Sequence, residues 1–292
     1  MTRLIQWYPG HIAKAERQLK ENLSRVDVVF EVLDARIPIA SQHPNVRDWL
    51  GEKPRVLVIN RMDMIPDELR SPWQAWFASQ GDYAHWTNAK VGKGLKPILK
   101  AAQTVGETVN ARRKQRGMRP RAVRALVMGL PNVGKSALIN RLVKRKAAKS
   151  ARRAGVTRQL QWVRISDAIE LLDAPGVIPW KLDDQVAAVK LAICEDIGEA
   201  AYDNQQVAAA LVENLVNLGS EGWVRDRYRL DPLDYSTGEE YIYELAQQRY
   251  RGDQERVAVL LLNDFRRGDL GAIALELPPV QNCDFRAVIS EP

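Results

Sequence analysis

The feature that most constrains this chain is the octapeptide GLPNVGKS at residues 129–136. It follows the apolar run RALVMG (124–129), which predicts a buried strand, and it opens a stretch that predicts a helix. In that context the pattern G-x-x-x-x-G-K-[ST] is a phosphate-binding loop. Its glycines let backbone N–H groups surround a phosphate, Lys135 reaches the β- and γ-phosphates, and the Ser136 hydroxyl binds Mg²⁺. The predicted nucleotide contacts here are Asn132, Val133, Gly134, Lys135, Ser136 and Ala137.

A second motif of a phosphate site, DAPG at residues 173–176, ends the apolar stretch IELLD. A carboxylate at the tip of a buried strand, followed by a glycine that can approach the γ-phosphate, is the magnesium and switch arrangement of phosphate-loop enzymes. We therefore expect Asp173 to bind Mg²⁺ through water and Gly176 to contact the nucleotide. Thr157, in the segment between the two motifs, is a candidate for a second hydroxyl ligand of Mg²⁺. Alone, D-x-x-G is usually a turn, so these assignments depend on the neighbouring motifs.

Two tetrapeptides earlier in the chain indicate which base is bound. NRMD (60–63) ends the apolar run RVLVI, and Asp63 can accept hydrogen bonds from N1 and N2 of guanine, which adenine cannot donate. Asn60 is expected to hold the neighbouring loop. TNAK (87–90) ends another predicted strand, where the N–H of Ala89 can donate to guanine O6. An Asn or Asp at a strand end is ordinarily a turn residue, so each tetrapeptide is weak alone. The predicted base-site residues are Asn60, Arg61, Asp63, Asn88 and Ala89.

Strands and helices alternate through the first part of the chain. The predicted strands cover residues 26–35, 55–63, 83–87 and 124–129, with helices around 66–80 and 94–105. Residues 160–166 and 168–173 predict an adjacent antiparallel pair, and the basic segment 110–121 predicts a linker. This alternation predicts an α/β fold with a mostly parallel sheet and helices on both faces.

The chain changes character after residue 181. Apolar residues at helical spacing predict four amphipathic helices, at 184–200, 204–218, 239–250 and 253–267, which form a smaller all-α domain. Residues 269–279 predict a short closing strand, and the last dozen residues a loose tail. The expected domains are therefore 1–180, 181–280 and a tail at 281–292.

Charge is distributed very unevenly. Residues 108–166 hold 17 basic side chains and no acidic one, whereas residues 167–292 hold 11 basic and 24 acidic side chains. A long basic stretch without carboxylates favours a surface for a polyanion, whose phosphates Lys and Arg neutralise. A solvated face or a charged linker is the alternative interpretation.

Composition also bears on the compartment. No run approaches the roughly 18 apolar residues that span a membrane, and the first residues lack the apolar core of a secretory signal. The two cysteines, Cys194 and Cys283, show no CxxC spacing, which fits a reducing compartment. We expect a cytoplasmic protein that does not enter a membrane.

The four nucleotide motifs and Thr157 resemble those of translation-factor-type GTPases, but in a different order: the base motifs precede the phosphate loop. This order resembles the circularly permuted GTPases. With WYPGHIAKA (7–15), LDARIP (33–38) and the helical tail, the chain resembles the ribosome biogenesis GTPase A family, the YlqF type. The resemblance implies a circularly permuted GTPase domain at 1–180 and GTP hydrolysis with Mg²⁺. It also implies a role in late assembly of the large (50S) ribosomal subunit, with rRNA as the partner, and a monomer is expected.

This sequence departs from the family motifs at three positions. Arg61 stands where the motif usually has Lys, and its apolar stem can cover the nucleotide equally well. Asn88 replaces the more general Ser. Val177 follows DAPG where many GTPases place a water-orienting Gln, so the catalytic group beside Lys135 must come from elsewhere.

Two candidates could fill that catalytic role. The resembled family places a histidine at the position of His11, and a neutral imidazole can orient or deprotonate water; a helix-capping role is the alternative. In related GTPases an Asn at the position of Asn132 ligates K⁺, although a turn residue is an equally good interpretation. If neither candidate acts, a non-hydrolytic, GTP-dependent RNA-binding scaffold or another RNA-linked GTPase remains, whereas Asn60 and Asp63 argue against an ATPase.

Overall fold

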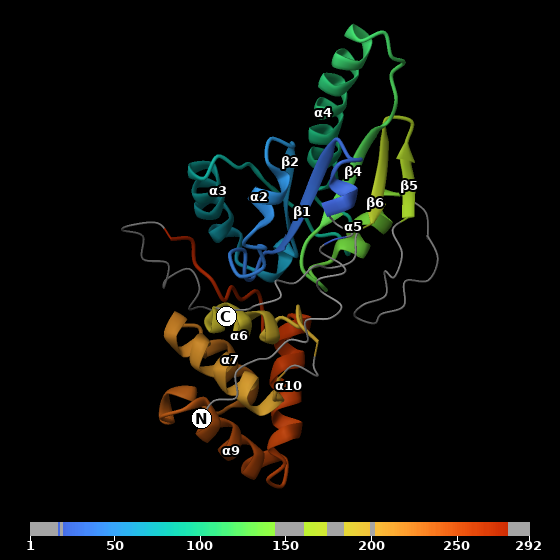
Figure 1. The fold of residues 1–292 in the computed structure, drawn as a ribbon. Helices are drawn as coiled ribbons and strands as arrows, with labels where there is room; N and C mark the ends of the chain where they lie inside the picture. The colour runs from blue at the N-terminus through green and yellow to red at the C-terminus, as the bar shows by residue number, and fades with distance from the viewer. Residues whose placement is uncertain (1–16, 18–19, 144–160, 174–183, 199–201, 280–292) are drawn as a thin grey trace.

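The computed structural model describes residues 17, 20–143, 161–173, 184–198 and 202–279. Its centre is a six-stranded sheet in the order β3-β2-β1-β4-β6-β5 (Figure 1). All neighbouring strands are parallel except β5, which is antiparallel to β6. The strands are β1 (Val28–Asp34), β2 (Arg55–Asn60), β3 (Ala84–Trp86), β4 (Val123–Met128), β5 (Gln161–Ser166) and β6 (Ile169–Asp173). The four strands predicted in the first part of the chain and the antiparallel pair are confirmed.

Helices cover both faces of this sheet, as predicted. On one face, α4 (Leu95–Gln115) and α5 (Lys135–Leu142) contribute apolar side chains to a cluster that includes Phe30 and Val127. On the other face, α2 (Val46–Leu50) and α3 (Arg70–Ser79) pack over two smaller clusters. Every residue of β1 is buried, which explains why apolar residues occupy both faces of the strand rather than alternate positions. The charge in the middle of the strand, Glu31, pairs with Arg55 (2.6 Å).

The predicted linker at 110–121 is wrong over its first half. Helix α4 continues for 21 residues to Gln115, and the loop that follows reaches β4 only at Val123. No Gly or Pro interrupts the helix between Gly106 and Gly117, and the basic residues Arg112, Arg113 and Lys114 of its last turn interact favourably with the helix dipole. High charge density therefore did not prevent helix formation here.

The second part of the described chain contains the helices α6 (Gln185–Ile193), α7 (Asn204–Leu218), α8 (Glu221–Tyr228), α9 (Gly238–Arg249) and α10 (Gln254–Arg267). Helix α8 was not predicted. The helix predicted at 184–200 ends at Ile193, because Glu195 adopts a left-handed conformation (φ 64°) and the N–H of Asp196 turns back to the carbonyl of Leu191.

The predicted strand at 269–279 is wrong as well. This segment forms no strand; instead it lies against the sheet layer, where the N–H of Leu275 donates to the carbonyl of Arg36 (2.9 Å). The carboxylate of Glu276 accepts the N–H of Ile39 (2.7 Å) and pairs with Lys190 (3.2 Å). The segment 269–279 therefore forms its polar contacts with the loop after β1 and with α6, instead of with a neighbouring strand.

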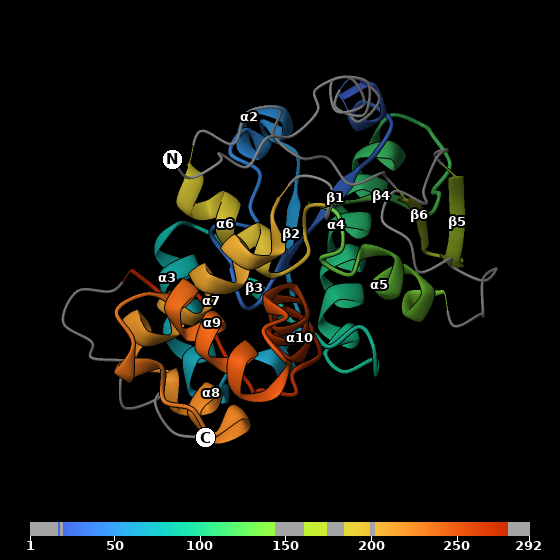
Figure 2. The ribbon, with the colours of Figure 1, turned by 90° about the horizontal axis from the view of Figure 1, so that it is seen from below.

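The helical part lies against the sheet part, below it in the view of Figure 1 and in front of it in Figure 2. The two parts share one cluster of buried apolar side chains, which includes Ile37 and Leu130 on one side and Ile193 and Phe265 on the other. The loop after β1 is where α6, α10 and the C-terminal segment meet the sheet. None of the helices in the described ranges is both long and apolar enough to cross a membrane.

Candidate nucleotide site

The predicted phosphate loop connects β4 to α5 at the carboxyl edge of the sheet. Its two motif glycines have conformations that other residues rarely adopt, φ 148° at Gly129 and φ 99° at Gly134. A Cβ on Gly129 would collide with the carbonyl oxygen of Val32, and one on Gly134 with the side-chain amide of Asn60. The glycines are therefore required both for the turn and for the close approach of the neighbouring strands.

Lys135 and Ser136 occupy the first turn of α5. The Nζ of Lys135 is buried, 7% exposed as a residue, and donates to the carbonyl of Leu130 within the same loop (2.6 Å). Ser136 is exposed. Backbone N–H groups at a helix N-terminus favour an anion, and a lysine that bonds a loop carbonyl can turn to a phosphate when one binds. The donor set fits the phosphates of a nucleotide.

Asn60 joins the base-recognition loops to the phosphate loop. Its Nδ2 donates to the carbonyl of Val133 (2.8 Å), and its Oδ1 accepts the N–H of Ala89 (3.0 Å). Because β2, β3 and β4 end at the same edge, motifs that lie 73 and 29 residues from Asn60 in sequence meet at one side chain. The Ala89 N–H, expected to donate to guanine O6, is thus already bonded to Asn60 and must share or exchange that bond to reach a base.

The other base-site residues have distinct environments. Asp63 lies in the short helix η1 (Met62–Met64) and is exposed, so its carboxylate is available to a ligand. Asn88 is buried, and its Oδ1 accepts the N–H of Val91 (3.1 Å), which shapes the loop. The guanidinium of Arg61 is held at the phosphate loop: its Nη2 donates to the carbonyl of Asn132 (2.7 Å), and its Nη1 lies 3.4 Å from Asp34. That the apolar stem of Arg61 covers the nucleotide stays a prediction.

A buried charge cluster beside the phosphate loop was not predicted. Arg36 and Asp34 are fully buried and form a two-pronged ion pair (3.0 and 2.7 Å). Burial alone would raise the pKa of Asp34, but the guanidinium groups of Arg36 and Arg61 outweigh it and hold that pKa below its usual value. Arg36 also donates to the carbonyl of Cys194 (3.3 Å), at the end of α6.

Asp196 completes this cluster from the helical part. It is fully buried, and neither of its carboxylate oxygens has a hydrogen-bond partner among the described residues. Burial and the charge of Asp34 raise its pKa to about 8, against the attraction of Arg61, Arg36 and Lys135. The carboxyl group is therefore largely protonated at neutral pH. LDARIP drew attention to Asp34 and Arg36 in the sequence, but nothing there pointed to Asp196.

The helical part also contacts the phosphate loop directly. Asn132 adopts a left-handed conformation (φ 58°), and its Nδ2 donates to the carbonyl of Glu195 (2.6 Å). The left-handed turn at Glu195 is what presents this carbonyl to the loop. The connection between α6 and α7 therefore touches the nucleotide site at Asn132 and, through Arg36, at the end of β1.

The remaining phosphate-site candidates are placed only in part. Asp173 is the last residue of β6 and is the register partner of Val127 in β4, two residues before the phosphate loop begins. Residues Ser136 and Asp173 supply oxygen donors, the ligand type that Mg²⁺ prefers. Thr157, Gly176 and His11 lie outside the described residues.

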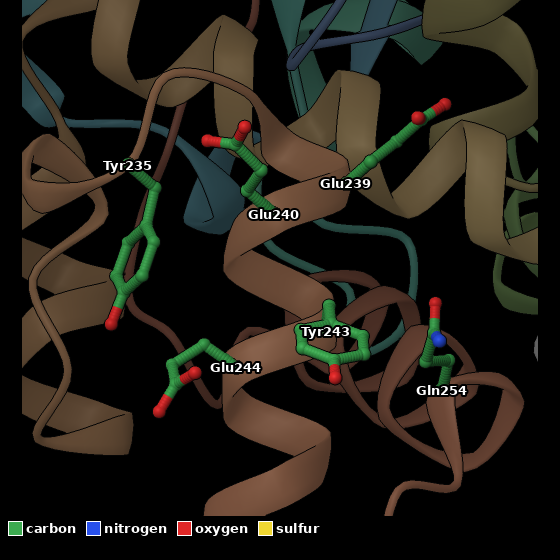
Figure 3. A pocket seen from close by; sticks show the side chains of 6 residues that line it. All are labelled: Tyr235, Glu239, Glu240, Tyr243, Glu244 and Gln254. Atoms are coloured by element: carbon green, nitrogen blue, oxygen red, sulfur yellow. The ribbon is translucent and has the colours of Figure 1, made fainter.

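A separate pocket lies in the helical part and does not belong to this site. Its volume is about 470 Å³, and α9 supplies four of its lining residues, Glu239, Glu240, Tyr243 and Glu244 (Figure 3). Three carboxylates around one pocket repel phosphate groups, so the carboxyl edge of the sheet remains the candidate nucleotide site.

The fold and the site together define a P-loop GTPase whose base-recognition motifs precede its phosphate loop. The family model described as 50S ribosome-binding GTPase matches residues 124–235. Ribosome biogenesis GTPase A of Bacillus cereus is 38% identical over 285 residues, 94% of each chain. The protein of that name from Thermotoga maritima is 27% identical and covers 97% of this chain and 100% of its own length.

Solved structures agree with this comparison. A GDP-bound YlqF structure has a TM-score of 0.65 at 24% identity, over 90% of this chain and 100% of that one. A GNP-bound YlqF from T. maritima has a TM-score of 0.64 at 25% identity, over 91% and 99%. The chain belongs to the ribosome biogenesis GTPase A family. Its activity is therefore GTP hydrolysis, which removes the non-hydrolytic scaffold from consideration.

Proposed function

We propose that this GTPase acts in late maturation of the large (50S) ribosomal subunit and binds its rRNA in the cytoplasm as a monomer. The observation that carries the proposal is the contact between Asn132 of the phosphate loop and the carbonyl of Glu195. It connects the helical part directly to the phosphate loop, so that the presence of GTP or GDP would change how the molecule fits a ribosomal surface. We propose that the domain expected at 1–180 binds and hydrolyses GTP and that the helical domain expected at 181–280 responds to the nucleotide state.

In the proposed site, Lys135 and the α5 N-terminus bind the phosphates of GTP, and Asp63 selects guanine. Magnesium, held by Ser136, Thr157 and, through water, Asp173, would neutralise charge on the β- and γ-phosphates. Lys135 then stabilises the charge that develops as the γ-phosphate leaves.

The attacking water needs a further group, because Val177 cannot polarise it. We propose His11 for this role, with K⁺ at Asn132 as an additional positive charge. The Nδ2 of Asn132 faces Glu195, which leaves its Oδ1 as the group available to a cation. Turnover in K⁺ that equals turnover in Na⁺ would remove K⁺ from the mechanism.

A depletion experiment tests the maturation role. Cells that lose this protein should accumulate incomplete large-subunit particles, and wild-type protein should restore mature subunits. The Lys135→Ala variant should fail to restore them, because it loses phosphate binding. A normal subunit profile after depletion would contradict the proposed function while leaving the GTPase activity untouched.

A further inference from the structure

The end of α4 and the loop that follows it form a basic arm, residues 112–121. Arg112, Lys114, Arg116 and Arg119 are all exposed, and none of these four side chains forms an ion pair with any described residue. The free cations of the arm are therefore available to a polyanion, unlike the arginines that pair with carboxylates elsewhere in the sheet part.

The arm has a fixed shape. The side chain of Asn110 bonds both the carbonyl and the N–H of Arg121 (3.0 Å each). The Nε of Arg113 donates to the carbonyl of Arg119 (3.0 Å), and Arg121 pairs with both carboxylate oxygens of Asp27 (2.7 and 2.9 Å). These bonds hold the loop on the helix end, so a ligand that binds the arm does not need to order it first.

The arm lies at the opposite edge of the sheet from the nucleotide. It precedes β4, whereas the phosphate loop follows β4, and Figure 1 shows the end of α4 projecting away from the helical part. The 21 residues of α4 span about 30 Å at 1.5 Å per residue. None of the residues that fix the arm, Asp27, Asn110, Arg113 and Arg121, belongs to the loops at the nucleotide site.

A hollow of about 660 Å³ beside the arm extends this surface. Asn110, Arg121, Gln103 and Arg164 line it together with Glu107 and Asp167. Arg121 and Arg164 already pair with Asp27 and Asp167, so the hollow adds amide donors and a recessed shape to the surface, while the unpaired charge comes from the arm itself.

We propose that the basic arm is a pre-formed anchor for the phosphate backbone of RNA and that its contribution to binding is the same in every nucleotide state. This inference rests on the proposed rRNA binding. It assigns the part of the binding affinity that does not depend on the nucleotide to residues 112–121 of the basic stretch. Switching would then change only those contacts made near the nucleotide edge.

The test compares two triple variants of the full chain. Arg112→Gln/Arg116→Gln/Arg119→Gln removes three charges from the arm. Lys93→Gln/Lys96→Gln/Lys100→Gln removes three exposed charges from the other end of α4 and its approach, and serves as the matched control. Affinity for purified large ribosomal subunits is measured between about 0.05 and 0.2 M salt with GDP, with a non-hydrolysable GTP analogue and without nucleotide.

The arm variant should lose affinity by roughly 10²-fold at 0.1 M salt and flatten the log–log salt dependence by about two to three units. This loss should be the same factor in all three nucleotide states, while the control stays near wild type. A loss confined to one nucleotide state, or an equal loss in the control, would overturn the inference. If the wild type itself failed to bind the subunits, the proposed function would fail instead.

Discussion

At the residue scale, selectivity for guanine depends on Asp63, whose carboxylate is exposed at the end of β2. Asp63→Asn should weaken GTP binding and restore tight binding of xanthosine triphosphate, because an amide can donate to the extra oxygen of xanthine. Isothermal titration calorimetry with GTP and with xanthosine triphosphate measures this change in nucleotide preference. Asp67→Asn, a nearby carboxylate that pairs with Arg70, is the control. GTP affinity that is unchanged in Asp63→Asn would remove this residue from the base site.

Asp196 predicts a pH dependence of stability. Its pKa is about 8 in the folded protein against 3.8 as the usual value, so the folded state holds a proton that the unfolded state releases between those limits. Stability should therefore fall as pH rises from about 4 to 8 and level off above. Asp34, Arg36, Arg61 and Lys135 are the charged groups that face Asp196.

Asp196→Asn removes this titration. In the nucleotide-free protein, Asp196→Asn should raise the free energy of unfolding at pH 8.5, with an upper bound on the order of 5 kcal/mol. This gain should shrink toward pH 5. Denaturant unfolding at the two pH values measures it, with exposed Asp269→Asn as control. A gain of the same size at both pH values would mean that Asp196 is ionised in the folded protein.

His11 predicts a kinetic effect without a binding effect. His11→Ala should lower subunit-stimulated turnover by roughly 10²-fold, the lower range for a general base, while nucleotide affinity stays unchanged. Single-turnover hydrolysis with saturating large subunits separates an effect on the rate of hydrolysis from an effect on nucleotide affinity. A variant that binds the subunits and hydrolyses GTP at the full rate would assign His11 a structural role.

Residue-level prediction from the sequence works where the chemistry is local. The phosphate loop and the base motifs are short sequence patterns at strand ends, so the meeting of Asn60 and the phosphate loop at one edge of the sheet could be predicted. The contact of Asp63 with guanine stays a prediction. Asp196 could not be predicted, because the environment of a buried carboxylate is defined by charged neighbours from three other segments, at residues 34–36, 61 and 135. The same holds for Arg61, whose partner Asn132 lies 71 residues away.

At the element scale, α4 packs unusually closely on β4. A Cβ at Gly106 would lie 3.3 Å from the Cβ of Val123, so a methyl group requires only a small shift, whereas a larger side chain must separate helix from strand. Gly106→Ala should be close to neutral, since the gain in helix propensity offsets the crowding. Gly106→Leu should lose about 1–3 kcal/mol. Thermal unfolding of the Gly106→Ala and Gly106→Leu variants measures this difference in stability. Equal stabilities of the two variants would show that α4 does not pack through Gly106.

Elements with a strong apolar pattern could be predicted, and those that tertiary contacts define could not. The strands and the helices α7, α9 and α10 follow from apolar periodicity, and the structure adds the N-caps Asp203 and Thr237 of α7 and α9. Helix α8 buries few side chains and shows little pattern. The segment 269–279 has the composition of a strand, but its polar groups bond to the loop after β1, so no strand forms.

At the scale of the whole molecule, the candidate nucleotide site lies between the basic arm and a helical part whose sequence holds more acidic than basic residues. The basic arm occupies one end, and the helical part lies at the carboxyl edge of the sheet, in contact with the phosphate loop (Figure 1). In the permuted order, the chain after DAPG passes directly into the helices. We propose that changes at the γ-phosphate reach the helical part through the contact of Asn132 with Glu195.

The measurement that tests this account most directly is GTP turnover by the full chain with and without purified large ribosomal subunits. We predict slow turnover of the free protein and a clear acceleration by the subunits, which the Lys135→Ala variant does not show. Equal turnover with and without subunits, under conditions where the protein is bound to them, would contradict the coupling between the nucleotide site and the ribosomal surface.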